Sequence, residues 1–77
     1  MEFEKLQEII AEALNMDPSE ITMDTKFIDD LGADSLDLFQ IILAIEDQFE
    51  ISISDAQAEG IVTVGDAVRE IRNAIGE

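Results

Sequence analysis

The sequence is marked first by the residue types that it lacks. Its 77 residues contain no cysteine, histidine, tryptophan or tyrosine, and a single proline. Without cysteine there is no disulfide and no thiolate nucleophile, and without histidine there is no imidazole base and no usual zinc ligand set. A serine–histidine–aspartate triad is excluded as well. Any thiol or cofactor chemistry must therefore come from a group that is attached or bound to the chain.

Basic residues are also scarce. Four lysines and arginines face nineteen acids, for a net charge of −15. Such a chain lacks the positive charge needed to bind nucleic-acid phosphates or anionic membrane surfaces. No stretch approaches the roughly 20 apolar residues of a membrane span. We therefore expect a monomeric, cytoplasmic protein with no nucleic-acid partner and no membrane insertion.

The acids concentrate in the middle of the chain. Between Phe27 and Val68 there are ten acids and no base. A surface of one sign attracts oppositely charged surfaces and steers their approach. We expect the partners to be proteins with basic docking patches.

Hydrophobic residues make up 47% of the chain, enough for one compact core. At this length we expect a single domain over residues 1–77. Apolar residues at helical spacing predict a first helix over residues 2–14, with Asn15 at its end. Residues 17–20 read Asp-Pro-Ser-Glu and predict one helical turn inside a long loop. Four apolar residues should attach that loop to the core: Ile21, Phe27, Ile28 and Leu31.

Three further helices follow. The second should begin near Asp34 or Ser35, with Asp34 as its N-cap, and end near residue 49 or 50. Residues 54–57 match a capping box and predict a short third helix that ends near Gly60. Residues 63–66 open the last helix less regularly, because Asp66 is shorter than the usual glutamate. Its expected buried stripe consists of Val64, Ala67, Val68, Ile71, Ala74 and Ile75.

Residues 51–54 alternate apolar and polar side chains but have no second strand to pair with, so we expect extended loop. The sequence as a whole predicts an all-α fold. It is a four-helix bundle of three main helices and one short helix, with a long loop between the first and second helices.

The second helix carries two apolar faces. One stripe is ordinary core and consists of Leu38, Ile41, Ile42, Ile45 and Phe49. Leu36, Phe39 and Leu43 fall on a different stripe, among acidic residues. We expect Leu36 and Leu43 to be exposed for a partner, whereas Phe39 fits the core and the docking surface equally well.

Residues 32–37 read Gly-Ala-Asp-Ser-Leu-Asp. This hexapeptide closely resembles the attachment motif of acyl carrier proteins of the bacterial fatty-acid synthesis type. Segments 27–31, 44–49 and 63–64 resemble the same family, so the similarity covers nearly the whole chain. Residue types alone leave a second interpretation open, in which Ser35 is only another candidate helix cap.

The resemblance implies that 4'-phosphopantetheine from coenzyme A is attached to Ser35 by a separate transferase. Asp34, Leu36 and Asp37 would flank the attachment site. The chain would then carry growing acyl chains as thioesters to fatty-acid synthesis enzymes, without catalytic residues of its own. A phosphodiester on Ser35 would lie at a helix N-terminus, where an anion is favoured.

The resemblance also implies two larger sets of residues. The residues that would line an acyl cavity are Phe27, Ile28, Ile45, Ile53, Ala58 and Ile61. Those that would contact partner enzymes are Leu36, Phe39, Gln40, Leu43, Glu46, Asp47 and Asp55. No specific metal site is expected. Divalent cations should bind weakly and reduce the repulsion among the acids at Asp29, Asp30, Asp34 and Asp37.

The chain departs from the usual family pattern in three places. Gln40 replaces an acid, Leu38-Phe39 replaces a smaller pair, and Ser54 replaces a common proline. These departures keep open a dedicated carrier for polyketide synthesis, lipid modification or aminoacyl transfer. A non-carrying acidic interaction module is a further alternative. A calcium-binding regulator is disfavoured because no Asp-x-Asp-x-Asp-Gly loop with a distal glutamate is present.

Overall fold

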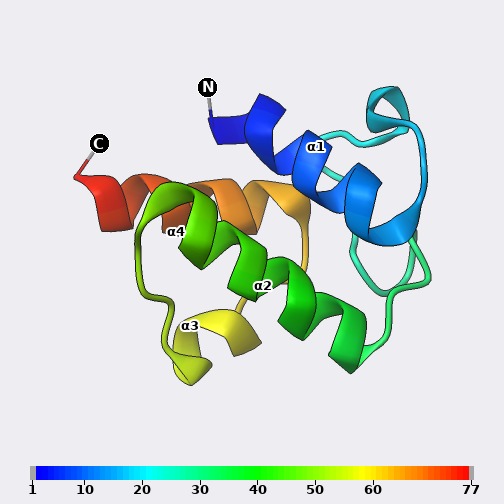
Figure 1. Cartoon of the computed structure of the whole chain (residues 1–77). Helices are drawn as coiled ribbons and strands as arrows, with labels where there is room; N and C mark the ends of the chain where they lie inside the picture. Colours follow the sequence, from blue (N-terminus) through cyan, green and yellow to red (C-terminus); the bar gives the residue numbers. More distant parts are fainter. Residues whose placement is uncertain (1, 77) are drawn as a thin grey trace.

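The structure is a computed structural model that describes residues 2–76. Its long helices are α1 (Glu2–Leu14), α2 (Ser35–Phe49) and α4 (Val64–Ile75), and α3 (Asp55–Glu59) is short. One 3-10 turn, η1 (Pro18–Glu20), lies within the long loop between α1 and α2. Figure 1 shows α1, α2 and α4 grouped together, with α3 at one edge of the group. The predicted all-α architecture of three main helices and one short helix is confirmed.

Within residues 2–76 no strand is present. Residues 51–54 are extended without a partner, as expected, and Lys26 and Thr63 form an isolated antiparallel bridge. Over the same residues, every helix is too short or too polar to be a candidate for a transmembrane span.

Capping boxes begin the last three helices. The N-cap side chains of Asp34, Ser54 and Thr63 each accept the backbone N–H of the third helical residue, whose side chain accepts the N–H of the cap. Each box therefore satisfies two donors that a helix start leaves free. The box of α4 forms completely even though Asp66 is shorter than glutamate. The chain leaves α1 through Asn15 in the left-handed region, with φ 55°, as expected.

The core lies where α1, α2 and α4 meet and is completed by the long loop. Ile21 and Phe27 come from that loop and are each only 1% exposed, which confirms that it is attached to the core. Full burial of one such side chain contributes roughly 1.5–3 kcal/mol. The largest fully buried side chains are Leu6, Ile10, Ile21, Phe27, Ile41, Ile45, Val64, Val68 and Ile71.

Three apolar residues that the sequence placed in the core are exposed instead. Ile28 is 56% exposed, Ile75 is 38% exposed, and Ala74 is also exposed. Figure 1 shows the last turn of α4 extending past the ends of α1 and α2, which leaves Ala74 and Ile75 uncovered. Ile28 follows the buried Phe27 directly, and the surface turn that begins there leaves its side chain outside the core.

Backbone hydrogen bonds join the long loop to the start of α4. The Val64 N–H donates to the Thr25 carbonyl oxygen over 2.9 Å, and the Gly65 N–H donates to that of Met23 over 2.8 Å. The approach at Gly65 is close, since a Cβ atom there would lie 3.0 Å from the Met23 carbonyl oxygen. The loop that leads to Ser35 is therefore fixed at its middle.

Candidate functional site

Ser35 is the first residue of α2, and its side chain is exposed. The helix cap is the preceding residue, Asp34, whose Oδ1 accepts the Asp37 N–H over 2.8 Å. The Asp34 N–H in turn donates to Asp37 Oδ2 over 3.4 Å. The interpretation of Ser35 as the helix cap is therefore wrong, and its hydroxyl is not needed to begin the helix.

The segment before Ser35 is held in place by Ala33. Its side chain is buried, at 3% exposure, and its N–H donates to the Phe27 carbonyl oxygen over 3.1 Å. Gly32 reaches this position with a φ of 69°, which an L side chain rarely adopts. An exposed serine thus lies on a helix start whose position is fixed from both sides.

The electrostatic environment of Ser35 is set by the helix start. The N–H groups of the first helical turn have no partner within the helix, and the helix dipole places partial positive charge there. Asp34 and Asp37 satisfy only the donors of the capping box. An anionic group on the Ser35 hydroxyl would be stabilised at this position.

Ser35 lies at the rim of an open groove of about 330 Å³ between α2 and α3, here called the first groove. Its apolar floor includes Leu38 and Ile42, with Phe39 beside them. The α3 side of the first groove consists of Asp55, Ala58 and Glu59. The groove offers an apolar surface within direct reach of a group attached to Ser35.

A second groove, of about 200 Å³, continues from the first. The two grooves share Leu38, Ala58 and Glu59. The remaining walls of the second groove come from the long loop and from the segment that follows α3, and they consist of Lys26, Phe27, Ile28, Asp29, Ile61 and Val62. The two grooves together form a path from Ser35 to the junction of the loop with that segment.

Only some of the residues expected to line an acyl cavity lie on the two grooves. Phe27, Ile28, Ala58 and Ile61 lie on the second groove. Ile45 is 1% exposed in the core, and Ile53 packs partly buried against the core, so both lie away from the two grooves. Sequence reasoning did not assign Leu38, Val62 and Glu59 to this region. For Leu38 the available signal was its place at the edge of the core stripe of α2.

An exposed apolar face lies on α2, here called the docking face, and consists of Leu36, Phe39 and Leu43. These side chains are 63%, 55% and 48% exposed, respectively. The expectation of exposure for Leu36 and Leu43 is confirmed, and Phe39 belongs to the surface rather than the core. Gln40 and Asp47 are exposed on the same helix.

Glu46 differs from the other acids expected on the partner surface. It is half-buried, and its Oε2 accepts the Ile53 N–H over 2.8 Å. This hydrogen bond ties the extended segment before α3 to α2. Asp55, by contrast, is exposed at the first position of α3, on the rim of the first groove.

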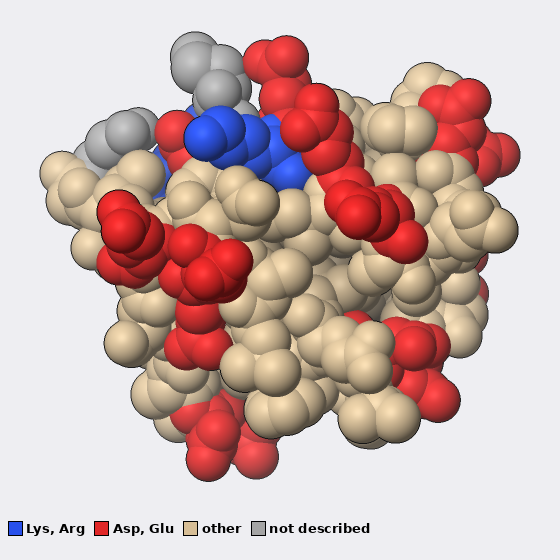
Figure 2. Space-filling view, in the orientation of Figure 1, with Lys and Arg blue, Asp and Glu red and all other residues tan. Residues whose placement is uncertain are grey.

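Acidic side chains dominate the surface. Figure 2 shows red side chains spread over the visible face and blue side chains gathered in one area at its top. Among residues 2–76 no cluster of three or more possible metal ligands is present. Several of the acids expected to bind divalent ions weakly are engaged with the backbone. Asp30 accepts the Lys26 N–H over 2.8 Å, and Asp34 and Asp37 form the capping box of α2.

Comparison with known proteins gives consistent matches. Residues 4–71 match a family described as the phosphopantetheine attachment site. An acyl carrier protein of a Sulfurovum strain is 49% identical over 71 residues, which cover 92% of this chain and 95% of that protein. An acyl carrier protein of Clostridium perfringens is 55% identical over 69 residues, which cover 90% and 91% of the two chains.

Solved structures agree with the sequence matches. The structure of a protein described as a putative acyl carrier protein, from Mycobacterium tuberculosis, superposes with a TM-score of 0.84 at 38% identity, and the match covers 99% of this chain and 96% of that one. An acyl carrier protein from Enterococcus faecalis gives a TM-score of 0.80 at 36% identity, covering 95% and 92% of the two chains.

Proposed function

This chain belongs to the acyl carrier protein family, and from that membership we propose that it carries growing acyl chains for fatty-acid synthesis on a 4'-phosphopantetheine arm attached to Ser35. Family members are carriers rather than enzymes, and their cofactor is phosphopantetheine. The position of Ser35 carries the proposal. Ser35 is exposed at the start of α2, it follows the capping Asp34, and it lies on the rim of the first groove.

The residues around Ser35 fit such an arm. The Ser35 hydroxyl would hold the phosphate at the N-terminus of α2, where free N–H groups and the helix dipole favour an anion. Leu38, Phe39 and Ile42 offer an apolar surface beside the attachment point. When attached, the arm supplies a terminal thiol that carries acyl groups as thioesters, which this cysteine-free chain cannot supply itself.

The proposed partners are a phosphopantetheinyl transferase and synthesis enzymes with basic docking patches. The docking face, with Asp47 beside it, offers an apolar centre and negative charge to such a patch. Tethering of the substrate would raise its effective concentration at each enzyme in turn. A single domain and a monomeric state belong to the same proposal. So does a cytoplasmic location, because Ser35 must meet coenzyme A and the transferase.

A dedicated carrier for another pathway is the second candidate. It is favoured by Phe39, a bulky residue that lines the first groove where the family usually has a smaller one. Gln40 also leaves one position of α2 without the usual acid.

Reconstitution with the elongation enzymes of a dissociated bacterial fatty-acid system separates the two candidates. The protein is first loaded with phosphopantetheine and then given acetyl and malonyl groups as coenzyme A thioesters, a reduced nicotinamide cofactor as the hydride donor, and the enzymes, and its intact mass is followed. Stepwise acyl growth supports the fatty-acid role. A loaded protein that is never elongated would point to another pathway. Leu43→Ser should slow elongation, whereas Met23→Ser, which alters another exposed apolar residue, should leave the rate unchanged.

A further inference from the structure

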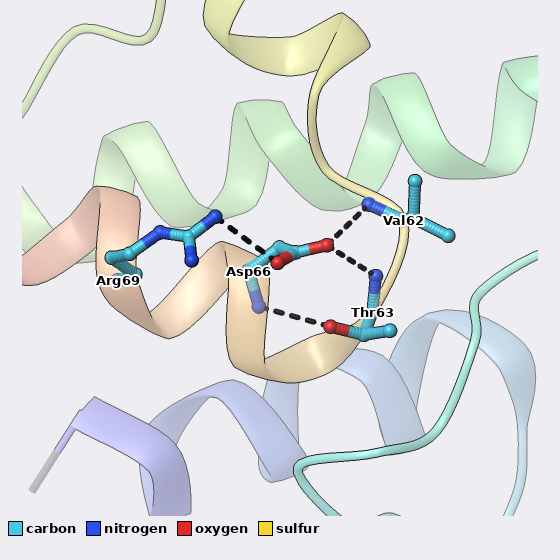
Figure 3. A network of polar contacts seen from close by, with 4 residues as sticks. All are labelled: Val62, Thr63, Asp66 and Arg69. Carbon is cyan, nitrogen blue, oxygen red and sulfur yellow. Dashed lines mark hydrogen bonds and ion pairs between the residues drawn. The ribbon is translucent and has the colours of Figure 1, made fainter.

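Asp66, on the first turn of α4, connects this helix to the segment that precedes it, as Figure 3 shows. Its Oδ2 accepts the backbone N–H groups of Val62 and Thr63, each over 3.1 Å. Its Oδ1 faces Arg69, whose Nη2 lies 3.1 Å away. The two carboxylate oxygens are thus divided, one toward the segment that follows α3 and one toward α4 itself.

The Val62 contact goes beyond the requirements of a helix cap. In the capping boxes of α2 and α3, the side chain of the third helical residue accepts the N–H of the cap residue. In α4, Asp66 also accepts the N–H of the residue before the cap. This additional bond attaches the start of α4 to residues 61–63, here called the α3–α4 linker.

The additional bond fixes one wall of the second groove. The Val62 carbonyl oxygen accepts the Phe27 N–H over 3.1 Å, so the backbone of Val62 is held on both sides, by Asp66 and by the long loop. Val62 and Ile61 line the second groove next to Phe27 and Ile28, and Leu38 and Ala58 line it as well. The position of the linker relative to Leu38 and Ala58 therefore depends on the hydrogen bond to Asp66 as well as on the bond to Phe27.

We propose that Asp66 is a positioning residue that sets the far wall of the second groove and so determines how well the chain shields the distal end of a long acyl group. The inference rests on the proposed carrier function. A short acyl group at the end of the arm has few carbons to bury and would gain little from the second groove. A long acyl group that follows the grooves past Leu38 and Ala58 would enter the second groove, where the linker forms part of the wall.

The hydrogen bonds of Asp66 also explain why its carboxyl group is ionised at neutral pH. Hydrogen bonds from the N–H groups of Thr63 and Val62 are the main causes that hold its pKa below the ordinary value for an aspartate, opposed by some desolvation. The charged acceptor is thus the form present at neutral pH, when the linker contacts are at their strongest.

The test compares shielding of a long and a short acyl thioester. Wild type, Asp66→Ala, Asp66→Glu and Arg69→Gln are loaded with phosphopantetheine that carries either a butanoyl or a decanoyl group. Cleavage of the thioester by hydroxylamine is followed by intact mass. Arg69→Gln is the matched control, because it removes the exposed ion pair and leaves the hydrogen bonds of Asp66 to the linker in place.

Asp66→Ala should speed cleavage of the decanoyl form by roughly fivefold, the factor expected from the net contribution of the additional hydrogen bond to Val62 alone. The butanoyl form should be cleaved at the wild-type rate. Asp66→Glu, which restores the usual capping-box acid, should recover most of the shielding, and Arg69→Gln should behave as wild type.

An equal acceleration of both acyl forms in Asp66→Ala would overturn the inference, because it would indicate general loosening of the fold. Unchanged decanoyl cleavage would also overturn it. A wild-type protein that cannot be loaded at all would instead overturn the proposed function. Amide hydrogen exchange in the unloaded protein gives an independent readout, since Asp66→Ala should raise exchange at Val62 and Thr63 and leave the core amides of Ile41 and Ile45 slow.

Discussion

At the scale of single residues, Asp34 and Ser35 have different roles at the start of α2. Asp34 caps the helix through the Asp37 N–H, and Ser35 is left exposed. If Ser35 itself capped the helix, its hydroxyl would be engaged with the backbone and unsuited to attachment of a group. The cap and the proposed attachment point are therefore adjacent but independent.

Replacement of Asp34 by alanine should destabilise the protein by about 1 kcal/mol, the usual effect of losing an N-cap. Urea unfolding at neutral pH measures this change. Loss of one acid also relieves repulsion in so acidic a chain, so Asp29→Ala serves as the matched control for charge. Equal stability of the two variants would contradict the assignment of Asp34 as the cap.

The pH dependence of stability should report on Asp66. Its pKa lies below the ordinary aspartate value of 3.8, because Thr63 and Val62 donate hydrogen bonds to the carboxylate. A carboxyl group whose pKa is lowered on folding stabilises the folded state above the unfolded pKa, and this contribution is lost as the pH falls through the folded pKa.

Asp66→Asn should therefore be less stable than wild type at pH values above 3.8, and the two should converge at lower pH. Thermal unfolding across the acidic range measures the difference between them. A difference that stays constant, or that grows on acidification, would show that the charge of Asp66 does not support its contacts.

At the scale of helices, α3 stands apart because none of its residues is buried. Apart from the packing of Ile53 and Ile61 on either side of it, α3 is attached to the rest of the protein by polar contacts to carboxylates of other helices. Glu46 accepts the Ile53 N–H before it, Glu70 accepts a hydrogen bond from the Gln57 side chain over 3.1 Å, and Asp66 holds the linker after it. Such an element should open at lower free energy than the core helices.

Removal of the Glu46 contact should loosen the chain before α3. Glu46→Ala should raise amide exchange at Ile53 by roughly fivefold, as expected from loss of about 1 kcal/mol of net hydrogen bonding. Asp47→Ala, at the next position and exposed, is the control. If both variants, or neither, changed exchange at Ile53, the role assigned to Glu46 would be wrong.

Helix boundaries were predictable because the signals that set them are local. Asp34, Ser54 and Thr63 are recognisable caps in the sequence, and each caps a helix in the structure. The exposure of Ile75 was not predictable, because helical periodicity defines a face but not the point where the neighbouring helices end. The linker contact of Asp66 was missed because the capping pattern does not specify a second acceptor role.

The candidate site was predictable only in part, because the sequence signals are local and the grooves depend on contacts between distant segments. The position of Ser35 follows from a contiguous motif, and the exposure of Leu36 and Leu43 follows from the period of one helix. The two grooves depend on contacts between α2, α3 and the long loop, which no local pattern encodes. Val62 therefore gave no signal in the sequence that would place it beside Phe27.

At the scale of the whole molecule, the charge is unevenly placed. Lys5 lies 5.9 Å from the ring centre of Phe49, at the C-terminal end of α2, and Arg72 pairs with Glu2 over 3.1 Å. Ser35 lies at the other end of this helix of 15 residues, a separation of roughly 21 Å along its axis. Attraction between unlike charges should therefore turn the Ser35 end toward a cationic partner.

Divalent cations should stabilise the protein. A net charge of −15 implies repulsion among the acids in the folded state, and an ion that binds the folded state preferentially raises its stability. We expect the melting temperature to be higher in millimolar magnesium chloride than in sodium chloride of the same ionic strength. An identical melting temperature in the two salts would contradict the expectation.

The central claim, that Ser35 is the attachment point of phosphopantetheine, is tested most directly by intact mass. The unmodified protein is incubated with coenzyme A, magnesium and a broad-specificity phosphopantetheinyl transferase. We predict a gain of one phosphopantetheine in wild type and in Ser52→Ala, an exposed serine elsewhere, and no gain in Ser35→Ala. A gain that persists in Ser35→Ala, or a wild-type protein that gains no mass, would contradict the account.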